Sequence, residues 1–133
     1  MHITLEADYA VRIVDRLASQ EGRLDAKSIA ADTGVTPRFT LKILRKLAAS
    51  GLVRSYQGAK GGYELARPAG KITLREVIET VEGVYALSRC VSPEHVCRCD
   101  CRFQRVYDEI SEMVRQKLSE VTFGGPMGKE GAE

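Results

Sequence analysis

The sequence lacks the residue groupings that indicate catalysis. Among its 133 residues there is no tryptophan, and histidine occurs only twice. It contains no Ser-His-Asp grouping and no paired carboxylates. The glycine-rich GAKGG at residues 58–62 joins two strand-like runs, and it lacks the G-x-x-x-x-G-K-S/T pattern of a phosphate-binding loop. We therefore expect that the protein is not an enzyme.

Long apolar runs are absent as well. No stretch approaches the roughly 18 apolar residues of a membrane-spanning helix. The N-terminal segment carries Glu6, Asp8, Arg12 and Asp15, whereas a secretory signal needs an uninterrupted apolar stretch. The length is sufficient for one domain with its own hydrophobic core. We expect a cytoplasmic protein without a membrane partner, whose thiols stay reduced.

Acidic residues are almost absent from one third of the chain. Residues 38–75 contain nine lysines and arginines and a single acid, Glu64, for a net charge of +8. The remainder has 11 basic and 17 acidic residues, or −6. A charged run often is only a solvated face, but this bias in sign coincides with the motif described next. It favours a polyanion as the partner.

Helix-start signals predict three helices in the N-terminal half. Thr4, Asp25 and Thr36 are capping residues that precede helical patterns, and Pro37 follows Thr36 as the first helical residue. In the third helix, residues 36–50, we expect Phe39, Leu41, Ile43, Leu44 and Leu47 to face inward, and Arg38, Lys42, Arg45 and Lys46 to face outward.

The second and third of these helices are joined by TGVTP and resemble a helix-turn-helix. The runs LVRSYQ and YELARP follow, separated by a glycine-rich turn that carries Lys60. They predict a two-stranded hairpin, the wing of a winged helix. The fold class expected is mainly α, with a winged helix-turn-helix domain at residues 1–83.

Helical periodicity resumes at Thr73, which forms a predicted capping box with Glu76. A long amphipathic helix is predicted at residues 102–122, and we expect a disordered tail at residues 123–133. One small domain offers little surface to cover the apolar stripe of this helix, so a homodimer is favoured over burial within the monomer. The stripe consists of Phe103, Val106, Ile110, Met113, Val114, Leu118 and Val121.

Residues 51–83, GLVRSYQGAKGGYELARPAGKITLREVIETVEG, resemble the Rrf2 family of bacterial transcription regulators. The GxxGG turn, the LARP segment and the V-E-G helix end carry the resemblance. The opening MHIT and DYAVRIV, together with TPRFTLKILRKLAASGLV, also fit, so the likeness extends over residues 1 to 120. It implies a winged-helix DNA-binding domain followed by a long dimerisation helix. The family includes iron–sulfur-assembly and nitric-oxide-sensing repressors.

On this basis we expect a homodimer that binds a double-stranded DNA operator. The helix at residues 36–50 is predicted to enter the major groove, and the wing to reach phosphate or the minor groove. Relatives often carry arginine where Gln57 stands. The alternative is an interaction module that does not bind DNA, and the basic run argues against it. The expected contacts are Arg38, Thr40, Lys42, Arg45, Lys46, Gln57, Lys60, Gly61 and Gly62.

Cysteine is absent except in CVSPEHVCRCDC, which holds all four within a predicted loop at residues 84–101. The resemblance implies that three of them, Cys90, Cys97 and Cys101, bind an iron–sulfur cluster, [2Fe–2S] or [4Fe–4S], that controls operator binding. Their spacing departs from the family pattern, because six and then three residues separate them instead of about five. Cys99 and His95 are therefore further candidate ligands.

Asp8 occupies the position of an acidic residue that completes the cluster from the partner subunit in some relatives. It is equally explained as a surface carboxylate favoured by the helix dipole, and His95 as a solvated loop residue. Two other chemistries remain open for the thiols. Zinc accepts four cysteines, or three with a histidine, and neighbouring thiols can form a disulfide switch.

Overall fold

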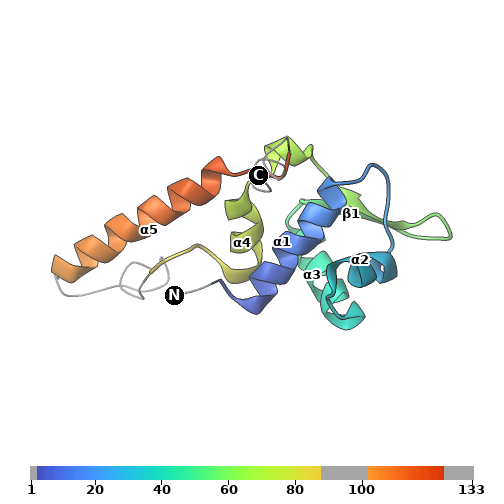
Figure 1. Ribbon diagram of the computed structural model, residues 1–133, viewed down its shortest axis with the longest axis horizontal. Helices are drawn as coiled ribbons and strands as arrows, with labels where there is room; N and C mark the ends of the chain where they lie inside the picture. The colour runs from blue at the N-terminus through green and yellow to red at the C-terminus, as the bar shows by residue number, and fades with distance from the viewer. Residues whose placement is uncertain (1–2, 88–101, 125–133) are drawn as a thin grey trace, which may run out of the picture.

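The computed structural model describes residues 3–87 and 102–124. Within these ranges the chain is mainly helical, with a small two-stranded sheet (Figure 1). This confirms the expected winged-helix architecture followed by a long helix. In chain order the elements are α1 (Leu5–Ala18), α2 (Ala26–Thr33), α3 (Pro37–Ala49), β1 (Val53–Tyr56), β2 (Gly62–Leu65), the 3-10 turn η1 (Ala69–Lys71), α4 (Leu74–Glu82) and α5 (Arg102–Glu120).

The helices begin where the capping residues predicted. The hydroxyl of Thr4 accepts a hydrogen bond from the Ala7 amide at 3.1 Å, and Asp25 accepts one from the Ser28 amide at 3.0 Å. Thr36 caps α3, and Thr73 forms a complete capping box at the start of α4. These local bonds satisfy amides that have no partner inside the helix.

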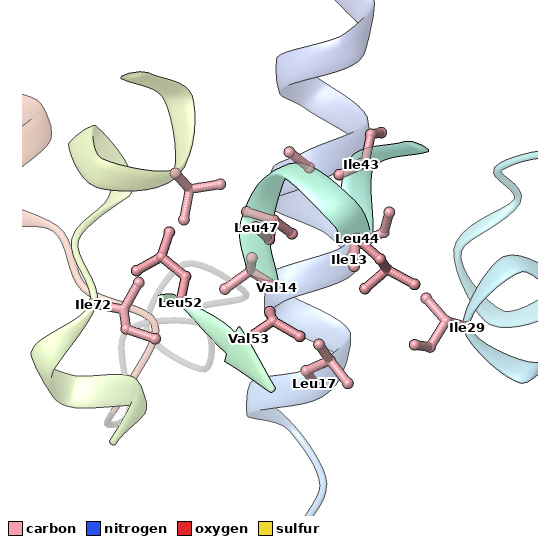
Figure 2. Close-up of a cluster of buried hydrophobic side chains, with 12 residues drawn as sticks. Ile13, Val14, Leu17, Ile29, Ile43, Leu44, Leu47, Leu52, Val53 and Ile72 are labelled. Atoms are coloured by element: carbon pink, nitrogen blue, oxygen red, sulfur yellow. The ribbon is translucent and has the colours of Figure 1, made fainter. Parts of the chain in front are cut away.

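The core lies where α1 and α3 cross, and it extends to β1 and α4 (Figure 2). Each fully buried aliphatic side chain contributes roughly 1.5–3 kcal/mol of transfer free energy, so this cluster fixes the angle at which α3 is presented. The cluster contains Ala10, Ile13, Val14, Leu17, Ile29, Ile43, Leu44, Leu47, Leu52, Val53, Ile72 and Val77.

Two side chains of α3 differ from the expected pattern. Leu41, expected inward, is 36% exposed, and Thr40, expected at the surface, is completely buried. The buried stripe of α3 comprises positions 40, 43, 44 and 47. This i, i+3, i+4, i+7 spacing places Thr40 at the centre of the inward face and Leu41 beside it.

The wing is an antiparallel hairpin in which Val53 pairs with Leu65 and Tyr56 pairs with Gly62. Leu24, in the segment between α1 and α2, adds one further bridge. Its amide donates to the Tyr63 carbonyl at 2.9 Å, and the Tyr63 amide donates to the Leu24 carbonyl at 2.7 Å. Strand β2 is therefore attached, near the tip end of the hairpin, to the segment between α1 and α2.

The chain after α5 returns to the winged domain. The Leu74 amide donates to the Val121 carbonyl at 2.8 Å, and the Phe123 amide bonds the carbonyls of Ala69 and Ile72, each at 3.2 Å. The Phe123 ring packs against the core. The expectation that the disordered tail begins at residue 123 is therefore wrong. Residues 125–133 lie outside the described part of the chain.

The N-terminal half of α5 projects from the domain (Figure 1). Its apolar side chains are exposed in the single chain, among them Phe103 at 52% and Met113 at 68%. The alternative that the whole stripe is buried within the monomer is therefore wrong. No helix in the described ranges has the length and apolar character needed to span a membrane.

Candidate nucleic-acid interface

The outer face of α3 carries two arginines that are available to a ligand. Arg38 and Arg45 are both exposed, and neither forms an ion pair within residues 3–87 and 102–124. Both were expected to contact DNA, and their location is compatible with that role. Free guanidinium groups on an exposed helix suit both phosphates and guanine edges.

Thr40 does not belong to this face. Its side chain is buried in the core, and its hydroxyl has no hydrogen-bond partner in the described part of the chain. Because it has no exposed surface, it cannot contact DNA in this structure, so its expected role as a DNA contact is wrong. Its inward position follows from the rotation of α3 that buries Ile43, Leu44 and Leu47.

Lys42 and Lys46 share one acidic partner. The carboxylate of Glu6, in the first turn of α1, lies 2.5 Å from the Lys46 ammonium and 3.2 Å from that of Lys42. The hydrogen bond from Lys46 is the main reason why the pKa of Glu6 lies below its ordinary value, and the bond from Lys42 adds to it. Sequence patterns give no signal for this contact, because Glu6 and Lys46 are 40 residues apart in the chain.

The wing tip exposes Gln57 and Lys60. Lys60 makes no ion pair within the described ranges, so its ammonium is available to phosphate. Gly58 adopts a φ of +94°, and its carbonyl accepts a hydrogen bond from the Gly61 amide at 2.9 Å, which closes the turn. This conformation is rarely open to residues with a side chain.

Gly61 and Gly62 are required for the fold of the wing, a role that was not expected from the sequence. A Cβ atom on Gly61 would lie 2.4 Å from the Tyr56 carbonyl oxygen, and one on Gly62 would lie 2.8 Å from that of Leu24. Gly62 is buried and has a φ of +140°. The expected contact through Gly62 is therefore wrong, because this glycine allows the wing to pack on the Leu24 backbone.

The basic run of the sequence divides into two groups in space. Arg67 pairs with Glu76, and Arg75 pairs with Glu79 at 3.2 Å. Arg75 also donates to the Ser119 hydroxyl of α5 at 3.3 Å. These arginines hold the C-terminal elements together. The candidate interface is therefore smaller than the charge count indicated, and it comprises α3 and the wing.

Asp8, a candidate ligand of the expected cluster, is accessible. Its carboxylate lies 3.0 Å from the Arg12 guanidinium, and 47% of its side chain is exposed. Within residues 3–87 and 102–124, no group of three or more His, Cys, Asp or Glu side chains is arranged to hold a metal ion. Cys90, Cys97, Cys99, Cys101 and His95 lie outside the described residues.

The chain before the cysteine segment is anchored on α5. The Leu87 amide donates to the hydroxyl of the buried Ser111 at 2.8 Å, and Arg115 donates to the Tyr85 carbonyl at 2.5 Å. The segment at residues 88–101 then connects directly to the start of α5 at Arg102. The residue before this segment, Leu87, is therefore bonded to α5, and the residue after it, Arg102, is the first residue of α5.

Two consecutive helices, the second with a basic outer face, and an attached hairpin define a winged helix-turn-helix protein. The model of the Rrf2 family, described as iron-dependent transcriptional regulators, matches residues 3–125. The chain belongs to the Rrf2 family. Its relatives are transcriptional regulators, which agrees with the expectation that the protein is not an enzyme.

Individual relatives support the same assignment. The regulator IscR of Xenorhabdus nematophila is 30% identical over 125 residues, which cover 92% of this chain and 76% of that protein. The structure of T. potens IscR is similar, with a TM-score of 0.78, 26% identity, and coverage of 100% of this chain and 89% of that one. CymR, the global cysteine regulator of B. subtilis, has a TM-score of 0.77 and 28% identity, with coverage of 92% and 93%.

The extent of the likeness varies between relatives. Two relatives from Mycobacterium tuberculosis share 38% identity over 91 residues, and this match spans 67% of the chain and 56% of their length.

Proposed function

We propose that the protein is a transcriptional regulator that binds a double-stranded DNA operator as a homodimer. The proposal rests on three exposed cations of α3 and the wing tip that form no ion pair within residues 3–87 and 102–124, namely Arg38, Arg45 and Lys60. Helix α3 enters the major groove, where the arginines contact guanine edges or phosphates. Lys60 contacts the backbone beside it. Glu6 limits how strongly Lys42 and Lys46 contribute.

The exposed apolar face of α5 supports the dimer. Phe103, Val106, Ile110 and Met113 form an apolar row that water covers in a single chain. Packing against the same row of a second chain removes this surface from water, as in a coiled coil. The test is gel filtration of Ile110→Glu, which should elute as a monomer, whereas Gln116→Glu on the same helix should elute as the wild type does. A wild-type monomer would contradict the proposal.

We further propose that operator binding is controlled by an iron–sulfur cluster. The donor chemistry fits, because thiolates are the standard ligands of such clusters and the chain gathers all four of its cysteines in residues 90–101. The description of the family as iron-dependent agrees. Cys90, Cys97 and Cys101 would hold the cluster, with Cys99, His95 or Asp8 as further ligands. When bound, the cluster would cross-link these residues. The cross-link would change when the cluster is oxidised or reduced, or when it reacts with a signal molecule.

A chain of contacts joins the cysteine segment to the DNA-reading helix. Leu87 bonds Ser111 of α5, and Arg75 of α4 bonds Ser119. The Glu82 carboxylate at the end of α4 accepts from the Thr4 amide at 2.9 Å. Residue 4 caps α1, whose Glu6 holds Lys46 of α3. Binding or loss of the cluster in residues 90–101 would shift α3 through these contacts, provided that the contacts can switch between two alternative arrangements.

The cluster is tested by the metal and sulfide content of protein purified without oxygen. Iron and acid-labile sulfide should be present in similar amounts, with broad visible absorbance. Cys90→Ala and Cys101→Ala should each remove the colour, whereas Cys99→Ala should retain most of it. Stoichiometric zinc in a colourless protein would contradict the cluster and favour a zinc site. A protein without metal would favour a thiol–disulfide switch.

A further inference from the structure

Arg23 contacts the wing from outside the basic run of the sequence. It lies in the segment between α1 and α2, directly before Leu24. Its guanidinium carbon is 3.4 Å from the centroid of the Tyr56 ring, a close cation–π stack. Its Nη1 donates a hydrogen bond of 3.2 Å to the backbone carbonyl of Lys60. One side chain therefore touches both the end of β1 and the wing tip.

The hydroxyl group of the same tyrosine ring is also held in place. The Tyr56 hydroxyl donates to the Glu64 carboxylate of β2 at 2.6 Å. The ring on which Arg23 stacks is thus held to the opposite strand of the hairpin. A planar guanidinium suits this position, because it can stack and donate in its own plane at once.

The wing needs such a support. A two-stranded hairpin is marginally stable by itself in water, and each strand here has four residues. The Leu24–Tyr63 bridge holds strand β2 just before the turn, whereas the tip itself, from Gln57 to Gly61, extends beyond the paired residues. Within residues 3–87 and 102–124, the side chain from outside the hairpin that donates a hydrogen bond to this tip is that of Arg23.

We propose that Arg23 is a positioning residue of the DNA interface, which holds the backbone of Lys60 so that the ammonium group meets a DNA phosphate. The inference rests on the proposed DNA binding. The hydrogen bond involves the carbonyl of Lys60 and not its side chain, so backbone position and ammonium charge can be changed separately. This separation makes the role measurable.

The test is a double-mutant cycle of DNA affinity, measured by fluorescence anisotropy with a duplex selected from a random pool. Arg23→Ala and Lys60→Ala should each weaken binding roughly two- to fivefold, the range of one exposed cation contact. The double variant should bind like Lys60→Ala alone, because no ammonium is then left to position. Losses that multiply in the double variant would show a direct phosphate contact by Arg23 and would overturn the positioning role.

Further variants isolate the stack. Arg23→Lys keeps the charge but not the planar group, so it should behave like Arg23→Ala. Arg12→Ala is the matched control, because Arg12 is exposed and lies 5.8 Å from the centroid of the Tyr9 ring. It should not couple to Lys60→Ala. Full affinity in Arg23→Lys would contradict the inference.

Tryptic cleavage after Lys60 without DNA gives a readout of the wing itself. Loss of the Arg23 contact should accelerate cleavage several-fold, whereas Arg12→Ala should not. Unchanged cleavage in Arg23→Ala would overturn the inference. If the wild type does not bind DNA, the proposed function fails and the inference fails with it. If the wild type binds and Arg23→Ala binds equally tightly, the inference alone is overturned.

Discussion

The carboxylate of Glu6 lies 2.5 Å from the ammonium of Lys46, so the first turn of α1 is joined to the last turn of α3. Only 19% of the Glu6 side chain is exposed, whereas 39% of the Lys46 side chain is. This ion pair is therefore less screened by water than a fully exposed one. Asp8, the candidate cluster ligand, follows two residues later on the same helix.

Glu6 should weaken DNA binding by pairing with Lys42 and Lys46. In Glu6→Gln, Lys42 and Lys46 lose their acidic partner and become available to phosphates. Affinity for duplex DNA should rise at low salt, and the log–log salt slope should steepen by roughly 0.9 for each lysine that gains a phosphate. Anisotropy titrations between low and physiological salt measure both quantities. Glu21→Gln, which removes an exposed acid of the α1–α2 segment, is the control, and an unchanged slope in Glu6→Gln would contradict this role of Glu6.

The same ion pair should make stability depend on pH on the acid side. The hydrogen bond from Lys46 lowers the pKa of Glu6 in the folded state. Its contribution is therefore present above the unfolded-state pKa, about 4.3, and is lost as the pH falls through the lower folded-state pKa. Urea unfolding should find Glu6→Gln less stable than wild type at pH 7, with a smaller difference at pH 3. An equal difference at both pH values would refute this assignment.

Thr40→Val should stabilise the protein. The buried hydroxyl of Thr40 has no partner within residues 3–87 and 102–124, and valine has nearly the same shape. Removing an unsatisfied buried group should raise the free energy of unfolding by about 1 kcal/mol, with DNA affinity unchanged. Thr33→Val is the matched control, because the Thr33 hydroxyl donates to the Ile29 carbonyl at 2.7 Å. It should be neutral or destabilising. Loss of DNA binding in Thr40→Val would restore Thr40 as a contact.

Phe123 should contribute to stability beyond the end of α5. Its ring packs on the core and its amide bonds the carbonyls of Ala69 and Ile72. Phe123→Ala should lower the free energy of unfolding by about 2 kcal/mol, less than for a fully buried phenylalanine. Removal of residues 125–133 should leave it unchanged, which also tests the expected disorder of that segment. Equal stability of Phe123→Ala and wild type would contradict the anchoring role.

The sequence predicted the elements whose signals are local. Thr4, Asp25, Thr36 and Thr73 cap the helices they were expected to cap, because a capping bond spans three residues. The wing followed from glycines between two β-type runs. The family resemblance, carried by contiguous motifs, agrees with the family match.

The errors arose where the answer depends on packing between distant segments. Thr40 and Leu41 are adjacent in the chain. Which of the two is buried depends on how far α3 is rotated about its own axis where it packs on α1. The sequence does not reveal that Gly62 is buried against the Leu24 backbone, because the two residues are far apart in the chain. The prediction that Gly62 contacts DNA is therefore wrong. The Glu6 contact also joins separate helices. The roles of the cysteines remain predictions, since those residues lie outside the described ranges.

The central claim is that α3 and the wing together form a DNA interface. The most direct measurement is the anisotropy of a labelled duplex, selected from a random pool, titrated with wild type and with the Arg45→Glu, Lys60→Glu double variant. Wild-type binding should be tight and should weaken with salt, by roughly 0.9 in the log–log slope per phosphate contacted. The double variant should not bind the duplex. It should still elute at the same volume as the wild type in gel filtration, because its dimer is intact. Salt-insensitive wild-type binding, or equal binding by the double variant, would contradict the central claim.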